Sequence, residues 1–420
     1  MVHERHFDTT FNGVNWPALR DELRPRAASA HSVAELRAVI RDMLGRLGQS
    51  HFALIARSDA AREESRDSTG ESNAVPGDVG LELRLVNGRF LVTRVDSGGP
   101  AAAAGVRPGW IAERAGGCRL VELWENRATT PRHRQAVFRA TYAASARLAG
   151  DAGTTVRTQF VNGRGAVVAL DLARAPERGE PVTFGNLPPF QTRFERTTID
   201  ASGVKVGVIR FNAWMSVILP PFDSAVNDMR AADGIVIDLR GNPGGVGGLV
   251  MGTSGHFLTE RVSLGTLRMR GSQLRYTANP RLANRAGQRV APFSGPVAIL
   301  VDGLTGSTSE VFAAGMQAIK RARVFGDTTA GAVLPALNER LPNGDVLYHA
   351  FADFLTPDGT RLEGRGVIPD AVVPLTRETL LSGHDAPLDA AVRWIAEKRG
   401  AGNGERGAKD PASVPPGPSP

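Results

Sequence analysis

Ser307 stands where serine chemistry is favoured, at the junction of a predicted strand and a predicted helix. The apolar run 296–301 reads as a buried strand, and the run 311–319 has helical character. The first amides of a helix have no partner within it, and the helix dipole adds positive potential there. A negative oxygen that forms beside Ser307 would be stabilised. The alternative is that Ser307 or Ser309 only caps the helix, a position that serine favours.

A second chemical signal follows the predicted strand 234–240, in the run Asp-Leu-Arg-Gly-Asn-Pro-Gly-Gly that ends at Gly245. A glycine-rich turn can direct a backbone N–H into a cleft, because glycine tolerates unusual φ and close approach. Pro243 has no N–H, so Gly244 is the expected donor, and with the amide of Thr308 it would form an oxyanion hole. The alternatives are a simple tight turn or a phosphate loop. The spacing fits neither a Walker A loop nor a dinucleotide fingerprint.

The amino-acid composition argues against several classes of function. The chain has 420 residues, enough for two or three domains, and a formal charge of +7 that is spread along it. Without a basic stripe carrying aromatic residues, we expect no nucleic-acid partner. Cys118 is the only cysteine, so an internal disulfide and a multi-cysteine metal site are excluded, and we predict no metal and no cofactor.

The sequence leaves the compartment and the oligomeric state open. No apolar run is long enough to span a bilayer, and the start, residues 1–5, is not followed by the apolar region of a signal peptide. The expectation is a cytoplasmic protein, or a periplasmic or secreted one if an export segment precedes this start.

Residues 1–56 are predicted to form an N-terminal helical segment. Ser32 and Glu35 have capping-box spacing before a helix that Gly48 ends. A strand over 50–55 would then carry His51, which on its own is more often structural than catalytic. Residues 57–77 are charged and rich in Ser, Gly and Pro, as is typical of a flexible linker.

Residues 78–175 resemble a PDZ domain of the bacterial protease type. The resemblance rests on the turn Val79-Gly80-Leu81 and on the Pro-Ala-Ala helix with the Gly-Val-x-x-Gly turn after it. It implies that the amides of Val79, Gly80 and Leu81 bind a peptide carboxylate while the peptide adds a strand to the sheet edge. The helix over 132–147 would line the groove. Trp110 stands where such domains usually have aspartate.

Residues 183–398 are predicted to form an α/β core, because strand patterns alternate with helical ones. Pro387 suits the first position of a closing helix over 388–398. Residues 399–420 are rich in Gly, Pro, Ser and charge, and we expect a disordered tail.

Three motifs together resemble the C-terminal-processing and tricorn-like serine peptidases. They are the Asp-Leu-Arg-Gly-Asn-Pro-Gly-Gly run, the Gly-Ser-Thr-Ser-Glu run with its helix, and Glu-Gly-Arg-Gly-Val-Ile-Pro-Asp starting at Glu363. The resemblance implies an α/β fold with a ClpP/crotonase-like protease core, an N-terminal helical segment and an inserted PDZ-like domain. It covers these units in the family's usual order.

The family uses two catalytic schemes. In the serine–lysine dyad the lysine lies in a turn after the helix, where this chain has Ala332, and Lys320 is better read as an exposed helix residue. In the tricorn scheme a Ser-His pair closes the N-terminal segment and a glutamate precedes a Gly-Val-x-Pro-Asp turn. Ser50, His51 and Glu363 occupy those places.

The resemblance therefore implies a serine endopeptidase acting on polypeptide substrates. Ser307 would attack the scissile carbonyl, His51 would carry the proton, and Glu363 would support His51 through Ser50. Two rivals remain open: a catalytically silent peptide- or lipophile-binding protein on the same fold, and a crotonase-like acyl-CoA enzyme. The first requires no hydrolysis, and the second requires a nucleotide pocket and no role for His51.

Overall fold

The computed structural model describes residues 1–56, 75–125 and 133–407, with the side chains of Glu125 and 401–407 left aside. Residues 57–74, most of the predicted linker, lie outside the described part, as do 126–132 at the start of the predicted groove helix. The predicted tail falls outside it from 408 onward.

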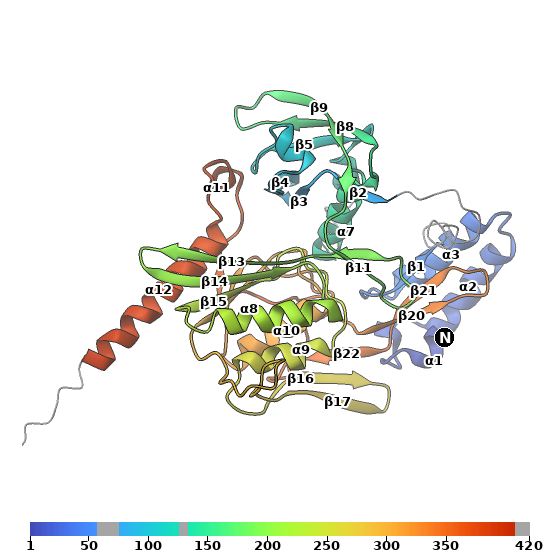
Figure 1. Cartoon of the computed structure of the whole chain (residues 1–420). Coiled ribbons are helices and arrows are strands. Elements are labelled where there is room, and N and C mark those ends of the chain that lie inside the picture. The colour runs from blue at the N-terminus through green and yellow to red at the C-terminus, as the bar shows by residue number, and fades with distance from the viewer. Residues whose placement is uncertain (57–74, 126–132, 408–420) are drawn as a thin grey trace, which may run out of the picture.

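A six-stranded sheet forms the centre of the molecule (Figure 1). Its order is β13-β14-β15-β18-β19-β23, with β13 antiparallel to β14 and the other neighbours parallel. The strands are β13 (Phe194–Ala201), β14 (Val204–Phe211), β15 (Gly234–Asp238), β18 (Val297–Val301), β19 (Arg323–Gly326) and β23 (Ala371–Val372). Every residue of β15 and β18 is buried, as expected for parallel strands covered on both faces.

Helices cover both faces of this sheet. On one face lie α8 (Leu219–Asp228), α9 (Leu249–Ser254) and α10 (Thr308–Ala318), whose apolar residues join one buried cluster with β14, β15 and β18. On the other face α12 (Ala386–Gly407) packs Ala391 and Ile395 against the same strands. This layering confirms the predicted α/β class, and it brings the carboxyl ends of β15 and β18 to one edge of the sheet.

The N-terminal segment is helical, as predicted, and it docks on the core. Its helices are α1 (Val2–Arg5), α2 (Trp16–Ala28) and α3 (Val33–Arg46), followed by β1 (Ala53–Ile55). Strand β1 pairs with β21 (Val346–Ala350), which pairs with β20 (Ala336–Arg340). Leu347 of β21 belongs to the apolar cluster of the segment. The segment therefore shares both a sheet and a buried cluster with the core.

Two local predictions in this segment need correction. The predicted strand 50–55 is shorter, because Ser50 and His51 form a turn and only Ala53–Ile55 pair. The predicted capping box is half formed: Ser32 Oγ accepts from the Glu35 N–H, but the Glu35 carboxylate accepts from the His31 N–H.

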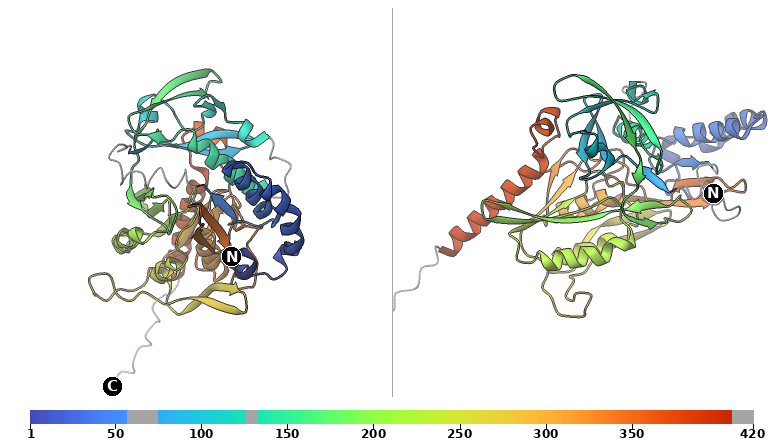
Figure 2. Two further views of the ribbon diagram at one scale, coloured as in Figure 1. Left: turned by 90° about the vertical axis from the view of Figure 1, so that its right-hand side faces the viewer. Right: turned by 45° about the horizontal axis from the view of Figure 1, so that its top comes forward.

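An inserted unit lies over the edge of the core (Figure 2). Its strands β3 (Leu81–Val86), β4 (Arg89–Val95), β5 (Ile111–Ala115), β8 (Thr155–Val161) and β9 (Val167–Ala173) form one sheet in that order, with β3 at its edge. Its helices are α5 (Pro100–Ala103), α6 (Glu122–Glu125) and α7 (His133–Ala146), and α7 packs on β3. At its base β2 (Pro76–Asp78) pairs with β10 (Ala175–Pro176), so the predicted bounds 78 and 175 are partners in a ladder.

The remaining elements complete the core and the base of the inserted unit. The additional strands are β6 (Cys118–Arg119), β7 (Gly150–Asp151), β11 (Glu180–Val182), β12 (Phe190–Thr192), β16 (Val262–Met269), β17 (Ser272–Ala278) and β22 (Ala352–Leu355). The additional helices are η1 (Phe11–Gly13), η2 (Ser216–Ile218), η3 (Gly255–Phe257) and α11 (Arg377–Leu381).

The closing helix α12 is longer than predicted at both ends, reaching Gly407, so the expected disorder from 399 does not hold up to that residue. Arg399 continues the contact with the core, because its Nε lies 3.2 Å from Asp233 Oδ1.

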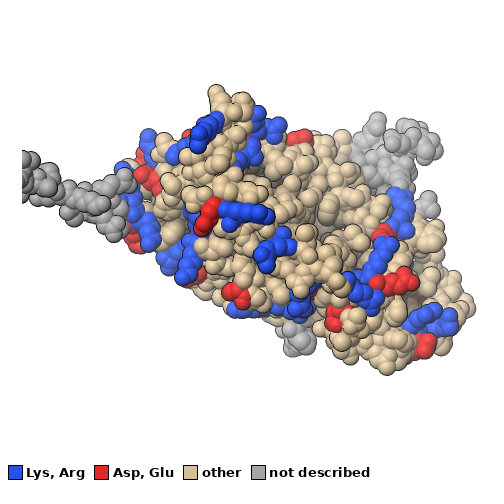
Figure 3. All heavy atoms as spheres, turned by 90° about the horizontal axis from the view of Figure 1, so that it is seen from below, with Lys and Arg blue, Asp and Glu red and all other residues tan. Residues whose placement is uncertain are grey.

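The charged surface is mixed. On the face seen from below, Lys and Arg are interspersed with Asp and Glu over several elements (Figure 3). Among the helices of the described residues, we find none with the length and apolarity needed to cross a membrane.

Candidate active site

Ser307 sits between β18 and α10 with backbone angles φ 52° and ψ −120°. A non-glycine residue rarely adopts positive φ, and the cost is about 1–3 kcal/mol unless its surroundings hold it there. Its N–H lies 2.8 Å from the carbonyl oxygen of Ala332 and 3.0 Å from Glu310 Oε2, and its carbonyl accepts from the Glu310 N–H. These bonds hold the serine at the amino end of α10, as predicted.

Glu310 is a fully buried carboxylate that organises this corner. Oε1 accepts from the Thr329 hydroxyl and the Gly331 N–H, and Oε2 accepts from the N–H groups of Ser307 and Ala332. Burial raises the pKa of Glu310 to about 7, against the opposing effect of these donors. Through these four hydrogen bonds, the Glu310 carboxylate links Ser307 to the turn 329–332.

Glu363, Ser50 and His51 form a continuous hydrogen-bonded chain. Ser50 Oγ donates to Glu363 Oε2 at 2.8 Å and lies 2.7 Å from His51 Nδ1, and the Ser50 N–H donates to Glu363 Oε1. Because the single hydroxyl proton of Ser50 points to the carboxylate, Nδ1 must carry a proton and donate to Ser50. Nε2 of the neutral ring then keeps its lone pair, the state required of a base.

His51 is held in an unusual backbone conformation two residues before β1. Its φ is 59°, in the left-handed region, after Gly48 at φ 74° has ended helix α3. Its ring packs on Tyr348 with centroids 5.5 Å apart, and burial lowers the pKa of His51 to about 4. The imidazole is therefore neutral at physiological pH.

Gly244 lies against Ser307. A Cβ at this position, where φ is 109°, would come within 2.6 Å of Ser307 Cβ and 2.9 Å of the Thr308 nitrogen. The Gly244 N–H donates to Asn242 Oδ1 at 3.0 Å. The predicted oxyanion role of Gly244 thus requires this bond to be exchanged for the substrate oxygen, a condition that the sequence did not reveal.

One cavity of about 1090 Å³ contains these groups. Ser50, His51, Gly244, Ser307 and Thr308 all line it, and so do Val79 and Leu81 of the inserted unit. Much of the remaining wall is apolar or aromatic: Phe52, Phe138, Tyr142, Phe184, Phe190, Val246, Tyr276, Val311, Val333, Tyr348 and Phe351. The cavity suits a polypeptide segment with apolar side chains.

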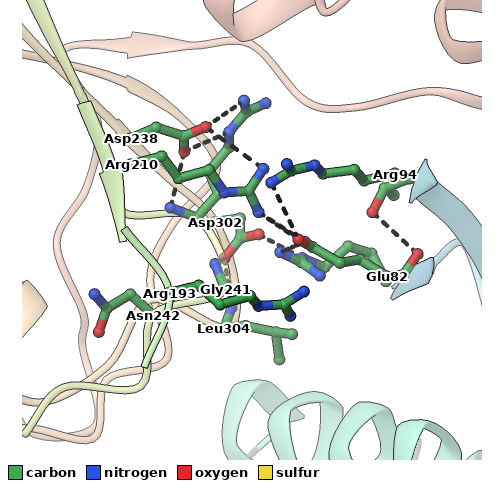
Figure 4. Close-up of polar contacts among 12 residues, drawn as sticks. Glu82, Arg94, Arg193, Arg210, Asp238, Gly241, Asn242, Asp302 and Leu304 are labelled. Atoms are coloured by element: carbon green, nitrogen blue, oxygen red, sulfur yellow. Dashed lines mark hydrogen bonds and ion pairs between the residues drawn. The ribbon is translucent and has the colours of Figure 1, made fainter. Parts of the chain in front are cut away.

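The inserted unit is fastened to the loops of the site by buried ion pairs (Figure 4). Arg84 of β3 pairs with Asp302, and Arg210 of β14 pairs with Glu82. Asp302 Oδ1 in turn accepts from the N–H groups of Gly241, at 3.0 Å, and Leu304, at 2.9 Å. The network therefore reaches both loops that lead to the site, the one after β15 and the one after β18.

Four residues here were not assigned by sequence reasoning. Glu310 lay within a quoted motif but had no assigned role. Asp302 follows the predicted strand, and nothing in the sequence marked its partner Arg84, which is 218 positions away. Gln135 of α7 is buried and approaches both Gly331 and Glu363, with each contact at 3.5 Å.

Of the residues relevant to a lysine dyad, Lys320 is exposed as expected but lies just beyond the end of α10 and not on the helix. Ala332 contacts Ser307 through its backbone, so a lysine here would reach the serine. Lys320 is exposed at the opposite end of α10, which is about 16 Å long at 1.5 Å per residue. Ser309 is buried and accepts from Trp214 Nε1, so it supports the helix from inside.

Sequence comparison supports a peptidase assignment. Residues 205–373 match Peptidase family S41, and residues 1–45 match the Tricorn protease C1 domain. A carboxyl-terminal-processing protease of Synechocystis sp. is 24% identical over 94% of this chain and 83% of its own length. A tricorn protease homologue of Streptomyces coelicolor is 25% identical over 94% of this chain. This chain spans 31% of that protein.

Solved structures agree on the fold. The photosystem II D1 C-terminal processing protease superposes with a TM-score of 0.59 and 22% identity, covering 93% of this chain and 94% of that one. Mature CPAF superposes with a TM-score of 0.61 and 13% identity, covering 95% and 97%. The protein is thus a serine peptidase with a mixed α/β fold. It carries a Peptidase family S41 domain and a Tricorn protease C1 domain, and its relatives include C-terminal-processing proteases and tricorn homologues.

Proposed function

We propose that this peptidase works through Ser307, His51, Ser50 and Glu363, and not through a serine–lysine dyad. The observation that carries the proposal is the Glu363–Ser50–His51 hydrogen-bonded chain, which opens on the cavity that Ser307 also lines. Ala332 has no ionisable group to serve as the alternative base, and Lys320 lies at the far end of α10.

In the proposed mechanism Ser307 Oγ attacks the carbonyl carbon of the scissile peptide bond. His51 Nε2 accepts the hydroxyl proton, and the resulting imidazolium keeps its Nδ1–H on Ser50, which is held by Glu363. The C–N bond then breaks, and His51 returns the proton to the leaving amine. Water, deprotonated by the same histidine, releases the second product from Ser307.

The tetrahedral oxyanion would be stabilised at the amino end of α10. The Thr308 N–H is one proposed donor, helped by the helix dipole. The Gly244 N–H is the second, once its bond to Asn242 Oδ1 is exchanged for the substrate oxygen. Gly244 lies close enough to Ser307 for this role, since only glycine fits there.

We further propose that the core is ClpP/crotonase-like and that the inserted unit is PDZ-like and docks the substrate. Its edge strand β3 and helix α7 border a groove continuous with the Ser307 cavity, and Val79, Gly80 and Leu81 form the turn before β3. Relatives are described as carboxyl-terminal-processing proteases and as tricorn homologues.

Hydrolysis of unfolded casein tests the proposal. The wild-type protein should cleave casein, a serine-directed phosphonate should block cleavage and label Ser307, and Ser307→Ala should be inactive and unlabelled. A folded wild-type protein that neither cleaves nor reacts would favour the silent binding protein. Bound acyl-CoA in such a protein would favour the crotonase-like alternative.

A further inference from the structure

The substrate cavity extends well beyond the catalytic residues. From Ser307 it follows Leu81 and Leu83 of β3, and it reaches Asp78 at the end of β2 and Glu177 just after β10. Strand β3 is the edge of its sheet, so one row of its backbone groups has no neighbouring strand. An extended polypeptide can pair with such an edge along its whole length, wherever the polypeptide itself ends.

The turn at the far end of this groove is already capped by a carboxylate. Asp78 Oδ1 accepts the Gly80 N–H at 2.9 Å. The carbonyl groups of the turn are also used, since Val79 O accepts from the Ala101 N–H and Gly80 O accepts from the Asp96 N–H. The Gly80 amide is one of those that a peptide α-carboxylate would need, and a side chain of the same chemistry occupies it.

Three carboxylates gather at this end of the groove: Asp78, Asp96 and Glu177. Burial raises the pKa of Asp78 and of Glu177, and the charge of Asp96 adds to the first shift and that of Asp78 to the second. Three guanidinium groups lie at this end. Arg193 pairs with Asp96 at 3.1 Å, Arg94 Nε lies 4.0 Å from Asp96 Oδ1, and Arg178 donates to the Ser97 carbonyl. These contacts are made to Asp96 and Ser97, while the Asp78 carboxylate is bonded to the Gly80 N–H.

We propose that Asp78 acts as an internal carboxylate cap, so that the groove between β3 and α7 takes an internal, extended segment of a polypeptide and does not select a free C-terminal carboxylate. This inference rests on the proposed peptidase function and defines its substrate class. A terminal carboxylate would have to displace Asp78 from Gly80 and bring a further negative charge beside Asp96 and Glu177. An internal segment needs only the strand edge and the apolar walls.

A binding measurement on the Ser307→Ala protein tests the cap. Two fluorescent peptides of one apolar sequence are compared by anisotropy, one with a free C-terminal carboxylate and one with a C-terminal amide. We expect dissociation constants within about twofold of each other. A free-acid peptide that binds about tenfold more tightly than the amide would overturn the proposal, and so would a failure of both peptides to bind.

Substitutions of Asp78 distinguish the effect of its hydrogen bond to Gly80 from the effect of its negative charge. In the Ser307→Ala background, Asp78→Gly exposes the Gly80 amide and should make the free acid bind about tenfold more tightly than the amide, as a charge-assisted hydrogen bond allows. Asp78→Asn keeps an oxygen acceptor for Gly80, so its preference should stay small and should remain measurable if the glycine variant does not fold. Glu177→Gln, at the same end without a contact to Gly80, is the matched control. An unchanged ratio in Asp78→Gly would contradict the cap.

Failure of this inference is distinct from failure of the peptidase proposal. Casein hydrolysis by the wild-type protein depends on Ser307 and His51 and not on how the far turn is capped. Casein cleavage together with a strong preference for free-acid peptides would overturn only the cap.

Discussion

At the scale of single residues, the assignment of the base rests on the direction of one proton. Ser50 gives its proton to Glu363, so His51 Nδ1 carries a proton and Nε2 keeps its lone pair, as the proposed attack by Ser307 requires. We predict that His51→Ala lowers the casein hydrolysis rate by roughly 10⁴-fold or more, as loss of a triad histidine does. Lys320→Ala should leave the rate unchanged, with both variants checked by thermal melting. If Lys320→Ala were inactive while His51→Ala stayed active, a serine–lysine dyad would have to replace the proposed histidine mechanism.

The pH profile is predicted to report Glu310. Three of the four groups bonded to its carboxylate are backbone N–H groups, which can only donate, and two of them bond Oε2. Protonation of Oε2 would therefore put a proton against two donors and loosen the turn that holds Ser307. Burial raises the pKa of Glu310 to about 7 and lowers that of His51 to about 4. Activity should therefore rise with pH through a step near 7. The folded-state pKa of Glu310 exceeds its unfolded value, so this group contributes most to stability at low pH. That contribution falls as the pH rises from about 4.5 to about 7.

A substitution at Thr329 assigns that step. Thr329→Val removes one donor to the ionised carboxylate, so the pKa of Glu310 should rise and the step should move up by about one pH unit, since such a bond is worth about 1.5 kcal/mol. The measurement is kcat/KM against pH for a fluorogenic peptide, with the neighbouring Thr328→Val as control. A step that stays in place in Thr329→Val would belong to another group, such as His51.

Much of the site could be predicted because its motifs are local in sequence. Ser307 and Gly244 lie in short sequence runs, and the strand, turn and helix around them can be predicted from the neighbouring residues alone. Asp302 and Arg84 are 218 positions apart and join only when the inserted unit docks on the core, so no local pattern marks them. The bond from Gly244 to Asn242 was equally hidden, because it depends on which way one peptide plane turns.

At the scale of elements, the loop after β15 is shaped to fit Ser307. We predict that Gly244→Ala lowers kcat by about 10²-fold or more, because its Cβ would press on Ser307 Cβ and shift the nucleophile by a fraction of an ångström or more. Gly248→Ala in the same loop meets nothing within 4 Å and is the control. The measurement is kcat for the same fluorogenic peptide. Normal turnover by Gly244→Ala would mean that the loop moves away from the serine during catalysis.

Element types were easier to predict than element ends. The buried strands β15 and β18 and the helix α3 follow clear apolar patterns and lie where those patterns indicate, and α7 lies where the PDZ resemblance implies a helix. The sequence around Ser50 and His51 predicts a strand, but the structure has a turn there. The Ser50 N–H donates to Glu363, which is 313 positions away, and no local pattern indicates this bond. Helix α12 likewise extends past the expected end, where Arg399 meets Asp233.

At the scale of the whole molecule, the inserted unit is held on the core both by ion pairs and by a small apolar cluster in which Leu91 and Ile111 pack against Leu380 of α11. Arg84 and Asp302 have side chains only 11% and 10% exposed, and Asp302 also fixes the N–H groups of Gly241 and Leu304. Removing one member of such a pair leaves the other charged and buried, which costs about 3–5 kcal/mol. The same loss would release the two loops that lead to Gly244 and Ser307, so stability and activity should fall together.

We therefore predict that Arg84→Leu lowers the free energy of unfolding by about 3 kcal/mol and also lowers kcat for short peptides that do not reach the inserted unit. Arg119→Ala in the same unit removes an exposed pair with Glu122, 58% and 55% exposed, and should change stability by less than about 0.5 kcal/mol. Urea titration gives the first quantity and peptide hydrolysis the second. If Arg84→Leu destabilises the protein but leaves kcat for short peptides intact, the network serves only to dock the unit. A fall in both would mean that the contact between the two units also holds the catalytic loops in their working positions.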